Sequence, residues 1–180
     1  MPNEPLIFLK PPSSVIWEGE PVVLPAISQQ VEFEGEIGVI VARTLSRVSE
    51  AEALRGIRGI AAVNDVTARD LQRSDGQWTR AKGFDTFCPL GEESSELPDL
   101  DSLTVVTRVN GVERQRGKSS EMVFSIPSLL AFISRIMTLE PGDLVATGTP
   151  SGVGPLVSGD VVEIEIPGVS RVTNPVEERP

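Results

Sequence analysis

The chain of 180 residues contains no histidine and no tyrosine, and it has a single cysteine, Cys88. The absence of histidine removes the side chain that most often serves as a general base and as a nitrogen ligand for metals. One cysteine excludes an internal disulfide and a thiolate zinc cluster, and it fits a reducing compartment. Any catalysis must therefore depend on carboxylates, lysine, arginine or metal-bound water.

Basic residues are also scarce. The chain has 16 Lys and Arg residues against 26 Asp and Glu residues, which gives a formal net charge of −10. A protein that binds a nucleic-acid backbone or an anionic membrane needs a basic surface, which argues against both kinds of partner. Residues 1–5 lack the basic and apolar stretches of a leader peptide, and no apolar run approaches the length of a membrane span. We expect a cytoplasmic protein with no nucleic-acid partner and no membrane partner.

Aromatic residues make up only 4% of a chain that is 39% hydrophobic, so much of the core must be built from Val, Ile, Leu and Ala. This mixture favours strands over helices. The length suits one domain over residues 1–180, and the predicted fold class is mainly β with a few helices (α+β). Six runs rich in Val, Ile and Leu are the expected strands: residues 6–9, 36–42, 59–64, 103–109, 143–147 and 161–166.

Helices are expected in three places. Ser49 and Glu52 have the spacing of a capping box and predict a short helix after them. Apolar residues at helical spacing predict a main core helix that starts around 125–128 and ends near Met137. A third, shorter helix is expected over residues 67–71, where Asp65 can act as its cap.

Turns and loops separate these elements. The Asn110-Gly111 pair between apolar flanks predicts a tight hairpin with positive φ at the turn. Residues 92–101 are acidic and contain Ser and Pro, so an exposed loop is expected there. Residues 174–180 read as a polar tail.

Three carboxylates dominate the functional interpretation. Glu34 and Glu36 are two residues apart in an apolar run, so in a strand they would point to the same face. Asp65 ends a second apolar run that begins near Ile57. Held about 5 Å apart at an effective dielectric near 20, each like-charged pair costs roughly 3 kcal/mol, so a cation or bound protons should be present. All-oxygen ligation suits Mg²⁺, Mn²⁺ or Ca²⁺ rather than Zn²⁺.

Polar residues elsewhere can complete such a site. If Asp65 opens a helical turn, Arg69 and Gln72 share its face at i+4 and i+7. The simpler interpretation is that Asp65 caps a surface helix and pairs with Arg69. Lys82 has apolar neighbours, where its ammonium can bind a carboxylate or lose its proton and act as a base.

Two further stretches carry weaker indications. Residues 147–154 are rich in glycine and hydroxyl side chains, among them Thr149, and can hold an anion, although such turns are usually structural. Cys88 has no histidine to activate it, so a packed and inert thiol is expected.

Five stretches, in this order along the chain, together resemble the fumarylacetoacetate hydrolase family: residues 8–11, 34–38, 64–72, 81–89 and 147–154. The resemblance extends from about Pro5 to Glu177. It implies a mixed β-roll around a Mg²⁺ or Mn²⁺ ion, usually in a homodimer. It also implies Glu34, Glu36 and Asp65 as metal ligands, Lys82 as a catalytic residue, and a substrate-binding wall of Arg69, Gln72, Lys82 and Thr149.

The resemblance implies an enzyme that acts on 2-oxo or 2-hydroxy-enoic acids. The ion would grip the α-oxo-carboxylate unit and stabilise the enolate that forms when a neighbouring C–C or C–H bond breaks. Hydrolytic members of the family carry a His-Glu pair, in many of them upstream of the Phe-x-Lys-Pro motif. This chain begins a few residues before Phe8 and contains no histidine, so we expect it to lack the family's N-terminal lid segment.

Isomerisation or decarboxylation, in the breakdown of aromatic acids, is therefore the expected reaction. Hydrolysis of an acylpyruvate is the alternative within the enzyme class. A non-catalytic remnant that binds a metal and a 2-oxo acid is a rival from another class. The simplest alternative is a plain β domain whose acidic residues are solvated.

Overall fold

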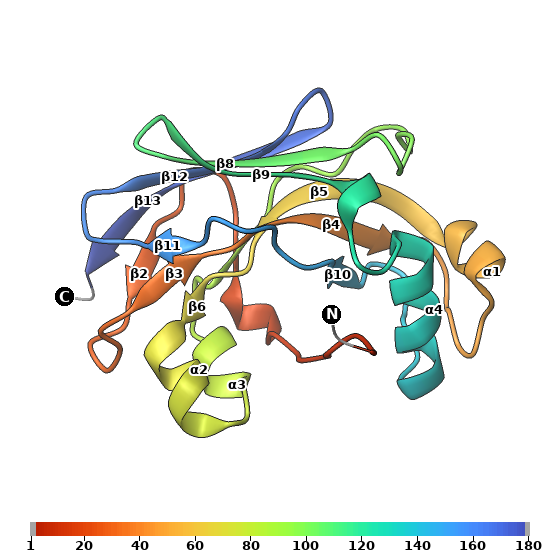
Figure 1. Cartoon of the computed structure of the whole chain (residues 1–180), viewed down its shortest axis with the longest axis horizontal. Coiled ribbons are helices and arrows are strands. Elements are labelled where there is room, and N and C mark those ends of the chain that lie inside the picture. The colour runs from red at the N-terminus through yellow and green to blue at the C-terminus, as the bar shows by residue number, and fades with distance from the viewer. Residues whose placement is uncertain (1–2, 179–180) are drawn as a thin grey trace.

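The structure is a computed structural model that describes residues 3–178, and it stacks two β-layers above a set of helices (Figure 1). The upper layer is a five-stranded sheet in the order β2-β13-β12-β8-β9, formed by Val22–Leu24, Ser170–Glu178, Val161–Ile166, Thr104–Val109 and Val112–Lys118. Below it lie the three-stranded sheets β10-β4-β5, formed by Leu144–Ala146, Gly35–Val41 and Ile57–Asn64, and β11-β3-β6, formed by Gly154–Pro155, Val31–Phe33 and Thr67–Ala68. The parallel pair β1-β7 consists of Val15–Ile16 and Cys88–Pro89.

The α-helices lie in two groups (Figure 1). Helices α2 (Arg69–Asp75) and α3 (Thr79–Lys82) lie below β3 and β6, whereas α4 (Ile126–Ile136) and α1 (Glu50–Leu54) lie at the far end of β4 and β5. Short 3-10 turns cover Pro12–Ser14 and Ser119–Glu121. No helix within residues 3–178 is both long and apolar enough to cross a membrane. The expected fold class, mainly β with a few helices, is confirmed.

The core lies between the two β-layers. The inward side chains of β12, Val162, Ile164 and Ile166, are each 1% exposed, and they alternate with more exposed residues as a half-buried strand requires. Strand β4 is buried along its whole length and β5 along all but one residue. Strands that are covered on both faces consist of nearly continuous apolar residues, which explains why β4 and β5 were recognisable in the sequence.

Five of the six expected strands are confirmed, as β4, β5, β8, β10 and β12, with ends that differ from the expected ones by no more than two residues. The expectation for residues 6–9 is wrong. No strand forms there; Leu6 and Leu9 are exposed, and the Phe8 ring packs against Trp78 at 5.6 Å between centroids. Pro11 and Pro12 follow after Lys10, and they lack the amide hydrogens that a strand would need to continue beyond this segment.

The two best-defined helices and the hairpin turn are confirmed. Ser49 and Glu52 form the complete capping box before α1, and Ser125 caps α4 by accepting a hydrogen bond from the Ser128 amide. The hairpin between β8 and β9 turns at Asn110 with φ 53° and at Gly111 with φ 76°. Residues 92–101 form the irregular and mostly exposed connection that their composition predicted.

The expected cap on the third helix is wrong. Helix α2 begins at Arg69 with no side-chain cap, because Thr67 and Ala68 first pair with β3 as strand β6. The Asp65 carboxylate instead binds the ammonium groups of Lys10 and Lys82. Asp65 is therefore a residue of the interior and not the start of a surface helix.

The interpretation of residues 174–180 as a polar tail is also wrong as far as residue 178. Strand β13 continues to Glu178 and pairs with β12 and β2. Asn174, in its middle, is buried and donates to the carbonyl groups of Trp17 and Glu20 at 2.8 Å each. Residues 179–180 lie outside the described part of the chain.

We predict that Gly35→Ala destabilises the protein by about 2 to 3 kcal/mol, as overpacking of a dense core does. A Cβ at position 35 would lie 2.0 Å from the Thr107 Oγ1 atom and 3.1 Å from the Ile164 Cδ1 atom. Urea unfolding measures the loss. Adding Thr107→Ala removes the closest atom, so the double variant should lose less stability than the sum of the two single losses. Full additivity would contradict this explanation.

Candidate metal centre

The site begins where the chain leaves one sheet and enters another. Strand β3 pairs with β6 and β11, whereas β4 pairs with β5 and β10, and Glu34 is the residue between β3 and β4. Glu36 lies two positions further on, at the start of β4, so both carboxylates point to the same side as predicted. The Asp65 amide donates to the Glu34 carbonyl at 2.8 Å, which places Asp65 beside the pair.

The three expected carboxylates therefore converge. Oxygen atoms of Glu34, Glu36 and Asp65 all lie within 4.8 Å of one another. These residues are only 6%, 3% and 1% exposed. Water screens such a cluster little, so each of its charges must be balanced by a cation or removed by a proton.

Glu36 is the carboxylate without a partner of opposite charge. It accepts a hydrogen bond from the Gly148 amide at 2.7 Å, but it enters no ion pair among residues 3–178. Burial, and next the charge of Asp65, raise the pKa of Glu36 to about 8. The cluster thus has room for further positive charge at Glu36.

Two lysines neutralise the other carboxylates. Lys82 is 2% exposed, and its Nζ atom lies 2.7 Å from Glu34 Oε2 and 2.6 Å from Asp65 Oδ2. The Phe8 ring lies against the same ammonium at 4.7 Å. Lys10 donates to Asp65 Oδ1 at 2.8 Å and to the carbonyl of Lys82 at 2.5 Å. Lys10 was missed as a site residue, although it lies in one of the stretches that carry the family resemblance.

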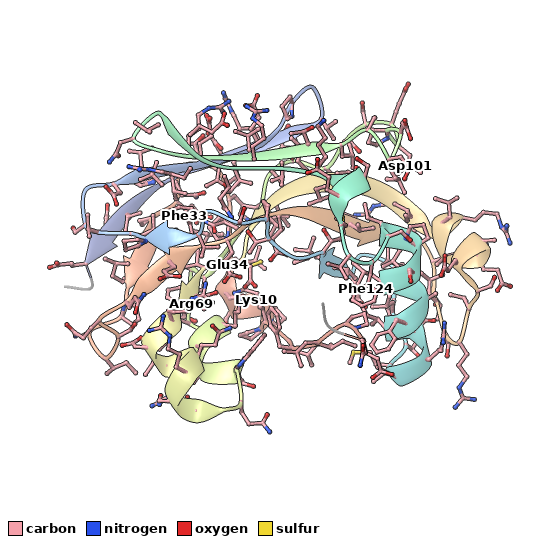
Figure 2. All side chains as sticks on the ribbon, viewed as in Figure 1. Lys10, Phe33, Glu34, Arg69, Asp101 and Phe124 are labelled. Carbon is pink, nitrogen blue, oxygen red and sulfur yellow. The ribbon has the colours of Figure 1, made fainter. Side chains whose placement is uncertain are left out.

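Arg69 binds the carboxylates of Glu32 and Glu34 and not that of Asp65. Its guanidinium contacts Glu34 and lies 2.8 Å from Glu32 Oε2. In Figure 2, Arg69 and Lys10 both lie below Glu34. It also donates to Gln72 Oε1 at 2.6 Å. Arg69 and Gln72 therefore meet on α2 as their spacing suggests, but the expected pair between Asp65 and Arg69 does not form because Lys10 and Lys82 occupy Asp65. Glu32 was not identified from the sequence.

The Thr149 side chain contacts the backbone of Gly35, the residue between Glu34 and Glu36. Its Oγ1 atom donates to the Gly35 carbonyl at 2.9 Å and accepts from Gln115 Nε2 at 2.8 Å. The structure thus places the loop 147–154 directly against the turn that carries Glu34 and Glu36. Gln115 had no distinguishing feature in the sequence, because it is one polar residue in the polar strand β9.

Cys88 is a packed thiol, as expected. It is 4% exposed, and burial raises its pKa to about 11. It therefore stays protonated at neutral pH and takes no part in the chemistry of the site.

The donor set fits a hard divalent cation. Metal–oxygen distances of about 2.1 to 2.5 Å allow ligand oxygens to lie up to roughly 5 Å apart across the ion, which matches the spacing of the three carboxylates. If Glu32, Glu34, Glu36 and Asp65 are all ionised, as metal binding requires, they oppose the charges of Lys10, Lys82 and Arg69 by four to three, a net charge of −1. Oxygen ligands in a negative, buried pocket favour Mg²⁺, Mn²⁺ or Ca²⁺.

Comparisons with known proteins show the family of the chain. Residues 1–177 match the model of the fumarylacetoacetate (FAA) hydrolase C-terminal family. The chain is 39% identical over 181 residues to human mitochondrial oxaloacetate tautomerase FAHD1, covering 97% of this chain and 82% of that protein. It is 48% identical over 174 residues to an uncharacterized protein from Archaeoglobus fulgidus, and the match covers 97% of this chain and 70% of that protein.

A solved structure shows the same fold. The 2-hydroxyhepta-2,4-diene-1,7-dioate isomerase from Mycobacterium marinum superposes with a TM-score of 0.96 at 46% identity, covering 99% of this chain and 71% of that chain. The mixed β-roll that the resemblance implied is therefore confirmed.

We predict that Lys82→Met destabilises the metal-free protein by about 3 kcal/mol, because it leaves Glu34 and Asp65 buried with less opposing charge. Urea unfolding in the presence of a chelator measures the effect, and added Mn²⁺ should restore part of the stability. Arg80→Met is the control, since Arg80 lies on the same helix but pairs with Asp75 at the surface. Equal losses in the two variants would contradict this role for Lys82.

A second prediction concerns pH. The folded pKa of Glu36 is raised from 4.5 to about 8, so the folded state binds the proton more tightly than the unfolded state does. The corresponding stability is fully present below pH 4.5 and is lost as the pH rises toward 8. In chelated protein, Glu36→Gln should abolish this loss, which is on the order of 3 kcal/mol between pH 5 and 8. Parallel stability curves for wild type and variant would refute the assignment.

Proposed function

The chain belongs to the fumarylacetoacetate hydrolase family, and from this premise we propose that it is a Mg²⁺- or Mn²⁺-dependent enzyme that isomerises or decarboxylates 2-oxo and 2-hydroxy-enoic acids. The observation that carries the proposal is the convergence of Glu34, Glu36 and Asp65 within 4.8 Å, surrounded by cationic side chains. Two of its relatives are named as an oxaloacetate tautomerase and a 2-hydroxyhepta-2,4-diene-1,7-dioate isomerase, and both names describe isomerisations of such acids.

The ion would be held by the three carboxylates and would supply an electrophile that polarises the 2-oxo group of the substrate. Arg69 presents a planar guanidinium, a group suited to bind a substrate carboxylate through two parallel hydrogen bonds. Gln72 contacts Arg69 and adds a neutral amide to the same wall. Thr149 anchors the opposing loop at Gly35.

Lys82 supplies the proton chemistry in this proposal. Its Nζ atom donates hydrogen bonds to Glu34 and Asp65, so the proton-bearing group lies against two of the expected metal ligands. A proton at that atom can be delivered to a substrate carbon when an enolate returns to the keto form. The Phe8 ring, which packs against Trp78, covers one side of the ammonium and helps to exclude water there.

Proton transfer fits these side chains better than hydrolysis does. Cleavage of a C–C bond by water needs a base that activates the water, and the chain contains no histidine. Decarboxylation needs only an electrophile and a proton donor. Isomerisation also needs a group that removes a proton from the substrate, and a carboxylate can perform this task without activating a water molecule. Acylpyruvate hydrolysis is therefore the second candidate. The homodimeric state and the cytoplasmic location stay predictions.

Metal binding tests the proposal directly. After chelation, calorimetric titration should show one Mn²⁺ bound per chain, and Glu34→Gln or Asp65→Asn should weaken binding at least roughly 100-fold, since each removes an inner ligand. Glu121→Gln, an exposed carboxylate on the surface, is the control. Unchanged affinity in both site variants would contradict the assignment of the ligands.

Turnover is the second test. With Mn²⁺ or Mg²⁺ present, the enzyme should accelerate the keto–enol conversion or decarboxylation of oxaloacetate, or the isomerisation of a 2-hydroxy-dienoate, and a chelator should abolish the activity. Absorbance of the enol and release of CO₂ distinguish the first two reactions. Cleavage of an acylpyruvate with no activity on the other substrates would instead establish the hydrolase. Metal binding without any turnover would indicate the non-catalytic remnant.

A further inference from the structure

Two buried side-chain amides hold the corner between β3 and β4. Asn64 Oδ1 accepts a hydrogen bond from the Glu34 amide at 3.0 Å, and Gln115 Oε1 accepts one from the Gly35 amide at 3.0 Å. Asn64 and Gln115 are 0% and 2% exposed. The backbone that carries the first two carboxylates is therefore fixed by specific side chains and not by strand pairing alone.

Gln115 also reaches the loop on the other side of the corner. Its Nε2 atom donates to Thr149 Oγ1 and to the Pro150 carbonyl, both at 2.8 Å. Thr149 Oγ1 in turn donates to the Gly35 carbonyl at 2.9 Å. The N–H and the C=O of Gly35, the residue between Glu34 and Glu36, are thus joined to one small ring of hydrogen bonds made by Gln115 and Thr149.

Strand β9 is packed closely against this loop. A Cβ at Gly117 would lie 2.6 Å from the Pro150 Cβ, and a Cβ at Gly152 would lie 2.3 Å from the Arg114 carbonyl oxygen. Arg114 and Arg116 on either side of Gln115 are exposed, so Gln115 is the inward side chain of this segment. The packing leaves the amide little freedom to move.

From this ring we propose that Gln115 is a positioning residue, which couples the carboxylates Glu34 and Glu36 to Thr149 and so sets metal affinity and substrate binding together. The inference rests on the proposed function of the site. Only a side-chain amide both accepts from Gly35 and donates to Thr149 and Pro150. A carboxylate would lack the donors and add negative charge to an acidic cluster, whereas lysine and arginine would lack the acceptor.

The test uses Gln115→Met, which keeps the length of the side chain and removes all three hydrogen bonds. Groups that orient metal ligands typically change affinity or activity by 10- to 100-fold, so we expect Mn²⁺ affinity to fall roughly 10-fold and KM for oxaloacetate to rise by a similar factor. Arg116→Gln, on the exposed face of the same strand, should change neither. Mn²⁺ affinity and KM within twofold of wild type, in folded Gln115→Met protein, would overturn the proposal.

A double-variant cycle separates positioning from a general loss of stability. If Gln115 acts through Thr149, the rise in KM for Gln115→Met combined with Thr149→Val should be close to that of Thr149→Val alone. Additive effects would overturn the coupling. Should Gln115→Met fail to fold, Thr149→Val and Thr149→Ser provide the test: only the loss of the hydroxyl should weaken Mn²⁺ binding, and equal Mn²⁺ affinity in both would overturn the proposal.

Failure of this inference is distinguishable from failure of the proposed function. Wild-type protein that binds no Mn²⁺ would remove the proposed function and the inference together. Wild-type protein that binds Mn²⁺ and turns over oxaloacetate, alongside a Gln115→Met variant that does the same, would remove the inference alone.

Discussion

The burial of Glu34, Glu36 and Asp65 together is the constraint on which the rest of this structure depends. Three carboxylates within 4.8 Å of one another cannot all stay ionised away from water without opposing charge. The fold meets this demand by directing Lys10, Lys82 and Arg69 into the same space from the N-terminal segment, α3 and α2. Glu36 receives no such partner, and burial together with the charge of Asp65 raises its pKa.

The β-layers explain how residues distant in the chain reach one point. Strand β4 lies against β5 with Gly35 opposite Asn64, so Asp65 emerges beside Glu34 as soon as β5 ends. The loop after β10 then returns to the same corner through Gly148 and Thr149. Because Gly35 has no side chain, the Thr107 hydroxyl of the upper sheet can approach its backbone closely, and the corner stays dense.

Much of this arrangement was predictable from the sequence. The alternation of side chains along a strand predicted that Glu34 and Glu36 share a face, and continuous apolar runs predicted β4 and β5. The residues themselves singled out Lys82 and the stretch that contains Thr149, and the family resemblance implied their roles. Glu32 continues the same alternation two residues before Glu34, but it was not identified. Gln115 gave no such indication, because it is one polar residue among several in strand β9.

The errors have a common cause. Residues 6–9 were expected to form a strand, Asp65 was expected to cap a helix, and residues 174–180 were expected to form a tail, each on the basis of local composition. In all three places long-range contacts decided the outcome: Phe8 packs on Trp78, Asp65 binds two lysines, and β13 pairs with β12 and β2. Local patterns describe the preferences of a segment, but tertiary pairing selects among them.

The balance of charges in the site supports a reaction that needs both a divalent ion and a dianionic substrate. With Glu32, Glu34, Glu36 and Asp65 ionised, the site and its three cations carry a net charge of −1. A divalent ion would change this to +1, and a dianionic 2-oxo acid would return it to −1. The ion would thereby make the pocket attractive to a dianion that the unoccupied carboxylates would repel. On this argument the metal and the substrate neutralise each other inside the fold, and the residues present have only to move a proton.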